Sequence, residues 1–245
     1  MTNNLYALHG NVFMIFLIKI ISNKERYRLM KKKIITVIAG IIAIILIVVV
    51  SDHYQGTTGS SDNTASSHKW TKKSFDQLKV GDFNETGKGG SSYESIVAKY
   101  GRPDKKSKTK ADNHILTVVS WKNIAGDYTG VTLTFMSQKD SSKTAKLTSK
   151  TLLDSKTINL AKKWTMTTYN AVELEDKNDQ EHAGDSLSSL TSKYGKPAVL
   201  TIARINGKVQ TNAVWHNTNG GANGTVSIDF SSHNTAVDKS QEKLR

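Results

Sequence analysis

The sequence contains no cysteine, and this absence removes several kinds of chemistry at once. Without thiols, the 245-residue chain has no disulfide bond, no thiolate metal site, no cysteine nucleophile and no lipidated cysteine. Proline is nearly absent as well, and the two prolines, Pro103 and Pro197, lie in closely similar five-residue segments. Because proline fixes the backbone and cannot continue a helix, its restriction to two matching places indicates a structural role there.

The common signatures of catalysis and metal binding are also missing. The seven histidines are scattered without an H-E-x-x-H pair, and no G-x-S-x-G nucleophile motif occurs. The acidic residues between Glu173 and Glu181 match no EF-hand spacing, and the glycine-rich segment 220–224 joins two expected strands instead of opening a helix. We therefore predict a non-enzymatic protein with no catalytic residue, no metal site, no cofactor and no nucleic-acid ligand.

One long hydrophobic run, residues 34–50, contains no charged residue over seventeen positions. At about 1.5 Å per helical residue it nearly spans a hydrocarbon core of roughly 30 Å. Three lysines precede it, so we expect a cytoplasmic segment at residues 1–33, a single transmembrane anchor and an extracellular C-terminal part. A cleaved signal peptide is the alternative, but Val48-Val49-Val50 lacks the small residues of a cleavage site. Met30 resembles a natural start, which would make residues 1–29 a start-site extension.

The rest of the chain is a polar linker, residues 51–68, followed by two similar halves. Residues of the first half recur in the second at a spacing of 94 positions (164 − 70 = 94). The matched pairs are Trp70 and Trp164, Asp82 and Asp176, Lys99-Tyr100-Gly101-Arg102-Pro103 and Lys193-Tyr194-Gly195-Lys196-Pro197, and Trp121 and Trp215. A constant period indicates one structural unit built twice, at residues 69–156 and 157–245.

Each half begins with short helical patterns and continues with strands. Ser91 or Ser92 is a suitable N-cap for a helix ending at Gly101, and Ser186 is the matching cap before a helix that ends at Gly195. Alternating or β-branched segments predict strands at residues 115–121, 131–135 and 146–153, and at residues 199–205, 210–215 and 226–230, with an Asn206-Gly207 hairpin turn. We expect residues from Ser231 onward to fray or to form a short helix. The fold class is therefore α+β: two tandem units, each a short helix pair packed on an antiparallel sheet.

This order of elements, with its Tyr-Gly-x-Pro segment and its strand tryptophan, resembles the tandem-repeat fold of β-lactamase inhibitory protein and related Gram-positive envelope proteins. A single unit is also similar to small lipoproteins of the outer-membrane β-barrel assembly machinery. The resemblance covers roughly residues 70–232 and implies a concave sheet surface that binds a protein or an envelope ligand. The inhibitory loop residues of that family have no position-by-position match here, so inhibition of a β-lactamase is not implied.

Charge differs between the halves and gives a second hypothesis. Residues 70–163 hold 18 Lys and Arg against 9 Asp and Glu (18 − 9 = +9), whereas residues 164–245 hold 8 against 9 (8 − 9 = −1). Four lysines, Lys105, Lys106, Lys108 and Lys110, lie in an expected loop after the first Tyr-Gly-x-Pro segment. They form either a solvated hairpin tip or a contact for anionic wall polymers or lipid headgroups.

The leading hypothesis is a membrane-anchored extracellular binding module, held in the cell membrane by residues 34–50. Trp121 and Trp215 lie at equivalent strand ends, and each is either a packing residue or an aromatic anchor on the sheet surface. The alternative is an electrostatic binder of wall polymer or lipid that uses the four lysines of the basic first half. The ligand itself is not identified by the sequence.

Overall fold

The computed structural model describes residues 69–111, 113–122, 124–125, 128–138, 144–154, 164–176, 183–217 and 224–244. Every described residue belongs to one compact unit, which lies within Gly59–Arg245. Within that part of the chain, no helix is long and apolar enough to cross a membrane. The predicted anchor at residues 34–50 and the predicted linker lie outside the described residues.

The N-terminal half contains three short helices and four strands. Thr71 caps the first helix with a capping box, and Ser92 caps the helix that ends at Gly101, where φ is 79°. The elements are α3 (Lys72–Asp76), the 3₁₀ helix η1 (Phe83–Glu85), α4 (Tyr93–Tyr100), β1 (Lys105–Ala111), β2 (His114–Trp121), β3 (Gly130–Ser137) and β4 (Lys146–Leu153).

The C-terminal half repeats this order of helices and strands, apart from the 3₁₀ helix. Thr165 and Ser186 cap its two helices, and Gly195, with φ at 87°, follows the second. The elements are α5 (Met166–Asn170), α6 (Leu187–Tyr194), β5 (Val199–Ile205), β6 (Lys208–Asn217), β7 (Gly224–Phe230) and β8 (Ala236–Glu242). The turn between β5 and β6 is the predicted Asn206-Gly207 pair, with positive φ at both residues.

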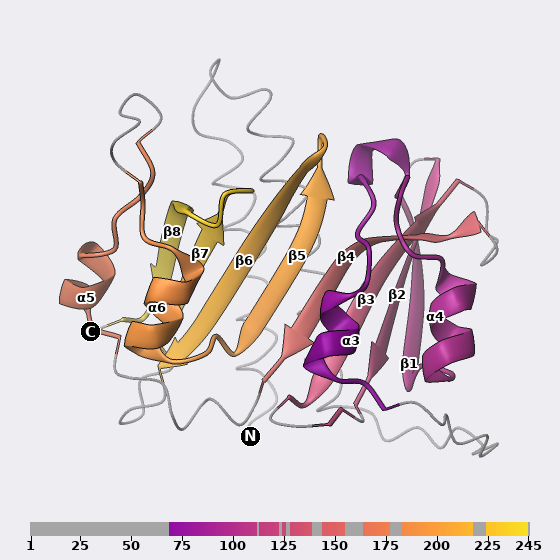
Figure 1. Ribbon diagram of the computed structural model, residues 1–245, viewed down its shortest axis with the longest axis horizontal. Coiled ribbons are helices and arrows are strands. Elements are labelled where there is room, and N and C mark those ends of the chain that lie inside the picture. The colour runs from indigo at the N-terminus through magenta and orange to yellow at the C-terminus, as the bar shows by residue number, and fades with distance from the viewer. Residues whose placement is uncertain are drawn as a thin grey trace, which may run out of the picture. The chain divides into compact units, whose positions relative to one another are not determined.

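All eight strands form one antiparallel sheet, in which each strand pairs with its neighbours in sequence (Figure 1). The two halves meet at β4 and β5, with Leu152 opposite Leu200 and Thr151 opposite Thr201. The α+β class predicted from the sequence is confirmed, with a continuous sheet across both halves.

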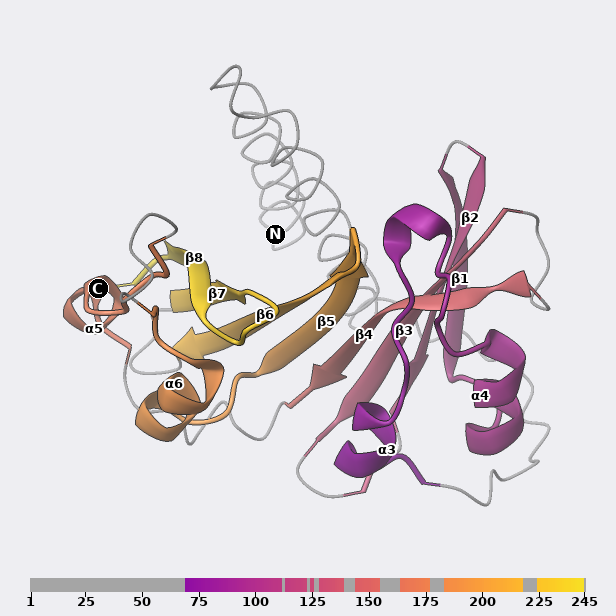
Figure 2. The same cartoon turned by 45° about the horizontal axis from the view of Figure 1, so that its top comes forward.

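The helices lie on one side of this sheet, as the two ribbon views agree (Figure 2). Phe75 of α3 and Ile96 of α4 pack with β2–β4 residues such as Leu133 in one core. Leu190 of α6 packs with β6–β8 residues in a second core, and Leu200 of β5 contacts both cores. The other side of the sheet carries no described helix, so it is called here the helix-free face.

Two expectations about local structure are wrong. Lys105–Ala111 is a strand and not a loop, because seven consecutive residues pair in register with β2. The segment after Ser231 also forms a strand, since residues of β8 pair with β7 from Thr225 to Phe230. Both are edge strands with few apolar residues, a composition that hides the alternation on which strand prediction depends.

Candidate binding surface

The two tryptophans predicted as surface anchors lie in the cores. Trp121 is 4% exposed and Trp215 is 1% exposed. Their indole nitrogens donate hydrogen bonds to the carbonyl oxygens of Gly101, at 3.2 Å, and Gly195, at 2.8 Å. Because ring and N–H are both engaged inside the protein, Trp121 and Trp215 are packing residues, and the alternative that they are exposed aromatic anchors is wrong.

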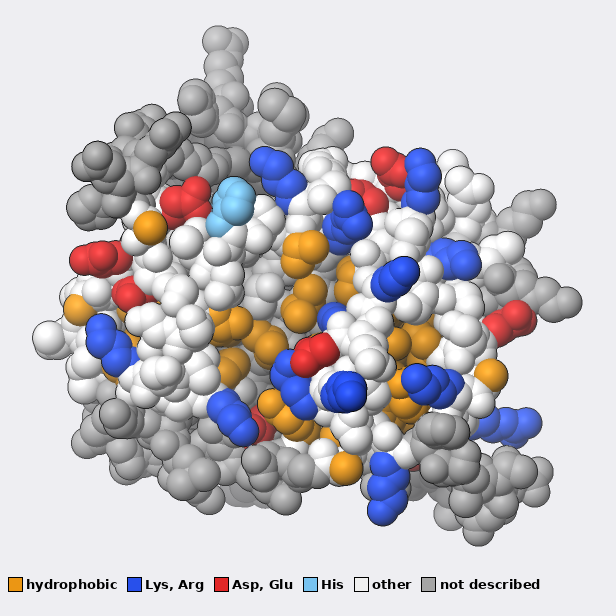
Figure 3. All heavy atoms as spheres, in the orientation of Figure 1, with side chains coloured by type: hydrophobic (Ala, Val, Ile, Leu, Met, Phe, Trp, Pro, Cys, Tyr) orange, Lys and Arg blue, Asp and Glu red, His pale blue; other side chains and the backbone are white. Residues whose placement is uncertain are grey.

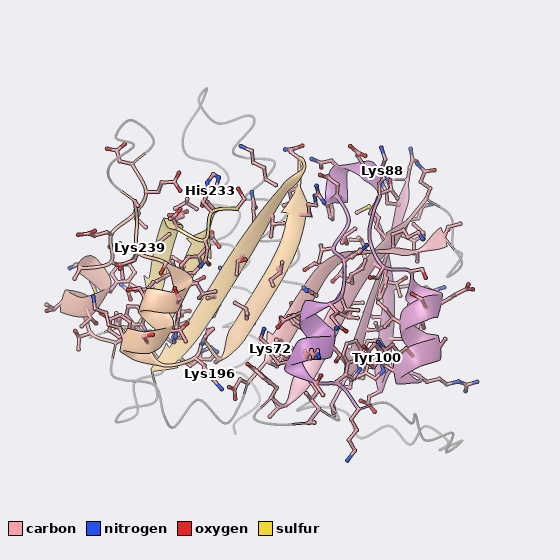
Figure 4. All side chains as sticks on the ribbon, in the orientation of Figure 1. Lys72, Lys88, Tyr100, Lys196, His233 and Lys239 are labelled. Carbon is pink, nitrogen blue, oxygen red and sulfur yellow. The ribbon has the colours of Figure 1, made fainter. Side chains whose placement is uncertain are left out.

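The tryptophans that open each half complete the same aromatic clusters. Trp70 stacks on Tyr100 with ring centroids 3.8 Å apart, and Trp164 stacks on Tyr194 at 3.9 Å. This confirms that Trp70 and Trp164 pack against the helices, and that the two Tyr-Gly-x-Pro segments are structural. Tyr100 is labelled on α4 in Figure 4.

The four predicted lysines are brought together on β1, which is the first strand of the sheet. The register assigns them to two faces, because residues paired across strands share a face. Lys106 pairs with Val119 of the core, so Lys106, Lys108 and Lys110 lie on the helix-covered face, whereas Lys105 lies on the helix-free face. Alternate residues of a strand are about 7 Å apart, so the three lysines form a row of evenly spaced positive charges.

One end of this lysine row is fixed by an aromatic contact. The Lys106 ammonium donates to the Tyr93 hydroxyl at 3.0 Å and lies 4.4 Å from the centroid of that ring. Tyr93 is the first residue of α4, so the helix orients Lys106 at one end of the row. β1 itself contains no acidic residue, and on the helix-covered face Lys and Arg side chains gather over α3, η1 and α4 more than over α5 and α6 (Figure 3).

The helix-free face is lined by hydroxyl groups in the centre of the sheet. Thr151 and Thr201 share a hydrogen bond of 3.1 Å between their hydroxyl oxygens across the junction. The side-chain oxygens of Thr132 and Ser149 on the same face are buried without a hydrogen-bond partner. All four strand aromatics of the described residues belong to the helix-covered cores, namely Trp121, Phe135, Trp215 and Phe230. Among the described residues, this face therefore has none of the strand aromatics that a binding surface of the sheet is expected to present.

An acidic pair lies toward the other edge of the helix-free face. Asp229 of β7 is paired with Asp238 of β8, and Asn212 donates to Asp229 at 2.7 Å. Burial raises the pKa of Asp229, and the charge of Asp238 raises it further, against the hydrogen bond from Asn212 that lowers it. The described residues contain no group of three or more side chains suited to hold a metal ion.

Two lysines that the sequence does not single out cap the short helices, Lys150, which is buried, and Lys239, which is half-buried. Lys150 of β4 donates to the carbonyl oxygens of Phe75, Asp76 and Leu78 at 2.9–3.1 Å. Lys239 of β8 donates in the same way to Tyr169, Asn170 and Val172 at 2.8–3.1 Å (Figure 4). The sequence gives no signal for this role, because the two lysines are 89 positions apart (239 − 150 = 89) and fall outside the period of 94.

A polar contact links the halves at the β5–β6 turn. The Asp82 carboxylate accepts hydrogen bonds from the backbone N–H groups of Gly207 and Asn84, and the Asn84 side chain donates to Asn206. Asp82 is 7% exposed, whereas Asp176, its match 94 positions later, is exposed. The same residue type thus lies at the junction in the first half and on the surface in the second.

Comparison with known proteins gives a family and one structural neighbour. The model of a family described as a domain of unknown function with a solved structure, DUF3862, matches residues 67–244. The crystal structure of a "putative beta-lactamase inhibitor protein" from Streptococcus mutans is 20% identical, covers 71% of this chain and 95% of that chain, and has a TM-score of 0.43. No curated protein matches the chain.

Proposed function

Because the chain belongs to the DUF3862 family, whose function is unknown, we propose a function from its own geometry: a non-catalytic module that binds an anionic polymer of the cell envelope. The observation that carries this proposal is the row of Lys106, Lys108 and Lys110 on the helix-covered face of β1. The predicted anchor at residues 34–50 would hold the module on the outer surface of the membrane.

Charge spacing supports a polymer over a single small anion. Three positive charges at intervals of about 7 Å along a rigid strand contact successive charges of an extended chain at once. The contact with Tyr93 limits the motion of Lys106 and so reduces the entropy lost on binding. The described residues of the helix-free face include hydroxyl groups and apolar side chains such as Leu116, Val118 and Met136, but no strand aromatic.

We also propose that the halves arose by duplication of one unit. In support, both halves have two short helices followed by four strands, and both have a Trp–Tyr stack. Both also have a register shift in the last strand pair, at Thr134/Phe135 and at Asp229/Phe230. The lysine row belongs to the first half alone, because β5 has Leu200 and Ile202 where β1 has Lys106 and Lys108.

The direct test measures binding of the full chain, in a non-ionic detergent, to poly(glycerol phosphate) and to anionic phospholipid vesicles. We expect polymer binding that weakens steeply as salt rises, because the attraction between exposed charges is screened. Changing Lys106, Lys108 and Lys110 together to glutamine should weaken binding about ten-fold or more at low salt.

A matched control separates a local site from net charge. Lys193, Lys208 and Lys243 are exposed lysines of the second half, and their triple change to glutamine removes the same charge elsewhere. We expect less than about a two-fold effect from it. Equal losses of polymer affinity in both triple variants, or polymer binding that does not depend on salt, would contradict the proposal. Binding to the vesicles but not to the polymer would also contradict it and would identify lipid as the ligand.

A further inference from the structure

The sheet ends in two edge strands of different charge. β1 and β8 are the first and last strands of the sheet, and no described strand pairs with the outer edge of either. β1 carries four lysines and no acid, whereas β8 carries Asp238 and Glu242 with one lysine, Lys239. An unpaired strand edge presents backbone donors and acceptors that another strand can complete.

The junction between the halves is a template for such pairing. β4 is the last strand of the first half and β5 is the first strand of the second, and they pair antiparallel over five residue pairs. Thr151 lies opposite Thr201, with a hydrogen bond between the hydroxyl groups, and Leu153 lies opposite Val199. In the same way, β8 is the last strand of the second half and β1 is the first strand of the first half, and these two strands form the edges of the sheet.

The register of each equivalent strand is fixed by independent contacts. Lys150 is paired with Leu133 of β3, and Lys239 is paired with Ile228 of β7, and each lysine caps the short helix of its half. Ser240 of β8 therefore corresponds to Thr151, and Glu242 corresponds to Leu153. In the same way, the 94-residue period relates Ser107 to Thr201 and Lys105 to Val199.

We propose that copies of this chain associate head to tail, with the outer edge of β8 in one copy pairing with the outer edge of β1 in the next. In the register of the internal junction, Ser240 lies opposite Ser107 and Glu242 lies opposite Lys105. The hydroxyl pair repeats that of Thr151 and Thr201, and the ion pair replaces the apolar pair of Leu153 and Val199. Lysines on β1 disfavour pairing with apolar or basic edges and favour an acidic one.

Two further residues fit this arrangement. Asp176 is exposed and has the position in the second half that Asp82 has at the internal junction. The turn after β1, at Asn113, has the position of Gly207, so Asp176 of one copy approaches the β1–β2 turn of the next. Lys108 lies opposite Lys239, and this like-charge pair weakens the contact and keeps association reversible. Because β8 and β1 are different surfaces, the contact is heterologous and does not close on itself in a pair.

The experiment is sedimentation velocity of the full chain in a non-ionic detergent at rising protein concentration. We expect a weight-average mass that grows past that of a dimer. Lys105→Glu places a second glutamate opposite Glu242, and Glu242→Lys places a second lysine opposite Lys105, so each variant alone should associate about five-fold more weakly. Lys193→Glu, an exposed change on α6, makes the same change in net charge as Lys105→Glu and should leave association unchanged.

Mixing the two edge variants is the decisive step. In an alternating mixture the contacts are of two kinds: Glu242 of β8 against Lys105 of β1, as in wild type, and a lysine from β8 against a glutamate from β1. Every contact therefore has an ion pair that neither variant forms with itself. Association of the mixture should therefore exceed that of either variant alone, which a variant that fails to fold cannot achieve. A constant monomer mass at all concentrations, or a mixture that associates no better than its components, would overturn the proposal. Polymer binding is read separately through Lys106, Lys108 and Lys110, so either proposal can fail without the other.

Discussion

At the scale of single residues, the two capping lysines, Lys150 and Lys239, show how short helices are held on this sheet. α3 and α5 have five residues each, too few to be stable alone, and their last carbonyl groups have no partner within the helix. Lys150 and Lys239 supply these partners from the last strand of each half. A positive charge at a helix C-terminus also interacts favourably with the helix dipole. Each helix is thus fixed to the sheet by a residue distant in sequence.

We expect Lys150→Met to lower the free energy of unfolding by about 2 kcal/mol, because three carbonyl oxygens lose their shared donor while the aliphatic packing is kept. Urea denaturation at pH 7 measures the change, and Lys193→Met, on the exposed side of α6, is the control. An unchanged denaturation midpoint in Lys150→Met would show that water replaces the ammonium group at no cost.

The pH dependence of stability, compared between wild type and Lys150→Met, gives a second prediction about Lys150. Burial lowers the pKa of Lys150 from 10.5 to about 8, with Asp76 opposing this shift and Lys72 adding to it. The unfolded chain therefore keeps this proton between pH 8 and 10.5 while the folded chain releases it. Since stability rises with pH when the unfolded state holds more protons, wild type should gain stability over this window relative to Lys150→Met.

The carboxyl group of Asp229 gives a pH dependence of stability with the opposite sign. The pKa of Asp229 is raised, so between its ordinary value of 3.8 and the raised value the folded state holds more protons than the unfolded state. The unfolding free energy contributed by this group therefore falls as pH rises through that window. Asp229→Asn removes the buried charge and keeps an oxygen acceptor for Asn212. Near pH 7 the variant should be more stable than wild type, and the gap should close as pH falls toward 3.8 in acid titrations followed by circular dichroism.

At the scale of elements, the sequence predicts those that carry both a local signal and buried apolar residues. β4 and β5 are found at the residues expected, and the serine caps and the Asn206-Gly207 turn are also confirmed. The two edge strands are missed for a common physical reason. β1 and β8 are strands because a neighbour pairs with their backbone, and their lysines, acids and serines give no alternation to detect.

The candidate site depends on β1 being a strand, which the sequence does not predict. The four lysines are visible in the sequence, but as a loop they have no fixed spacing, whereas on β1 the register divides them three to one between the faces. For Trp121 and Trp215 the sequence leaves two roles open, because a strand-end aromatic is equally typical of a core and of a binding surface. Their burial in the cores and their hydrogen bonds to Gly101 and Gly195 decide between these roles.

At the scale of the whole folded unit, the two halves are joined by more than a linker. The β4–β5 pairing continues the sheet, Leu200 packs on both cores, and Asp82 contacts the turn of the second half. Loss of either half therefore exposes apolar surface and backbone groups of the other. We infer that residues 69–244 unfold as one cooperative unit although two cores are present.

Amide hydrogen exchange, followed by mass spectrometry on the full chain at low concentration, tests this coupling. In wild type, peptides from β2–β3 and from β6–β7 should exchange with the same free energy, because both require opening of the junction. Asp82→Ala leaves the Gly207 N–H without its acceptor and should lower that free energy by about 1–2 kcal/mol in both halves equally. Asp176→Ala makes the same substitution at the exposed matching position and should change neither half. A loss confined to the first half in Asp82→Ala would mean that the cores unfold independently and that the shared sheet does not couple them.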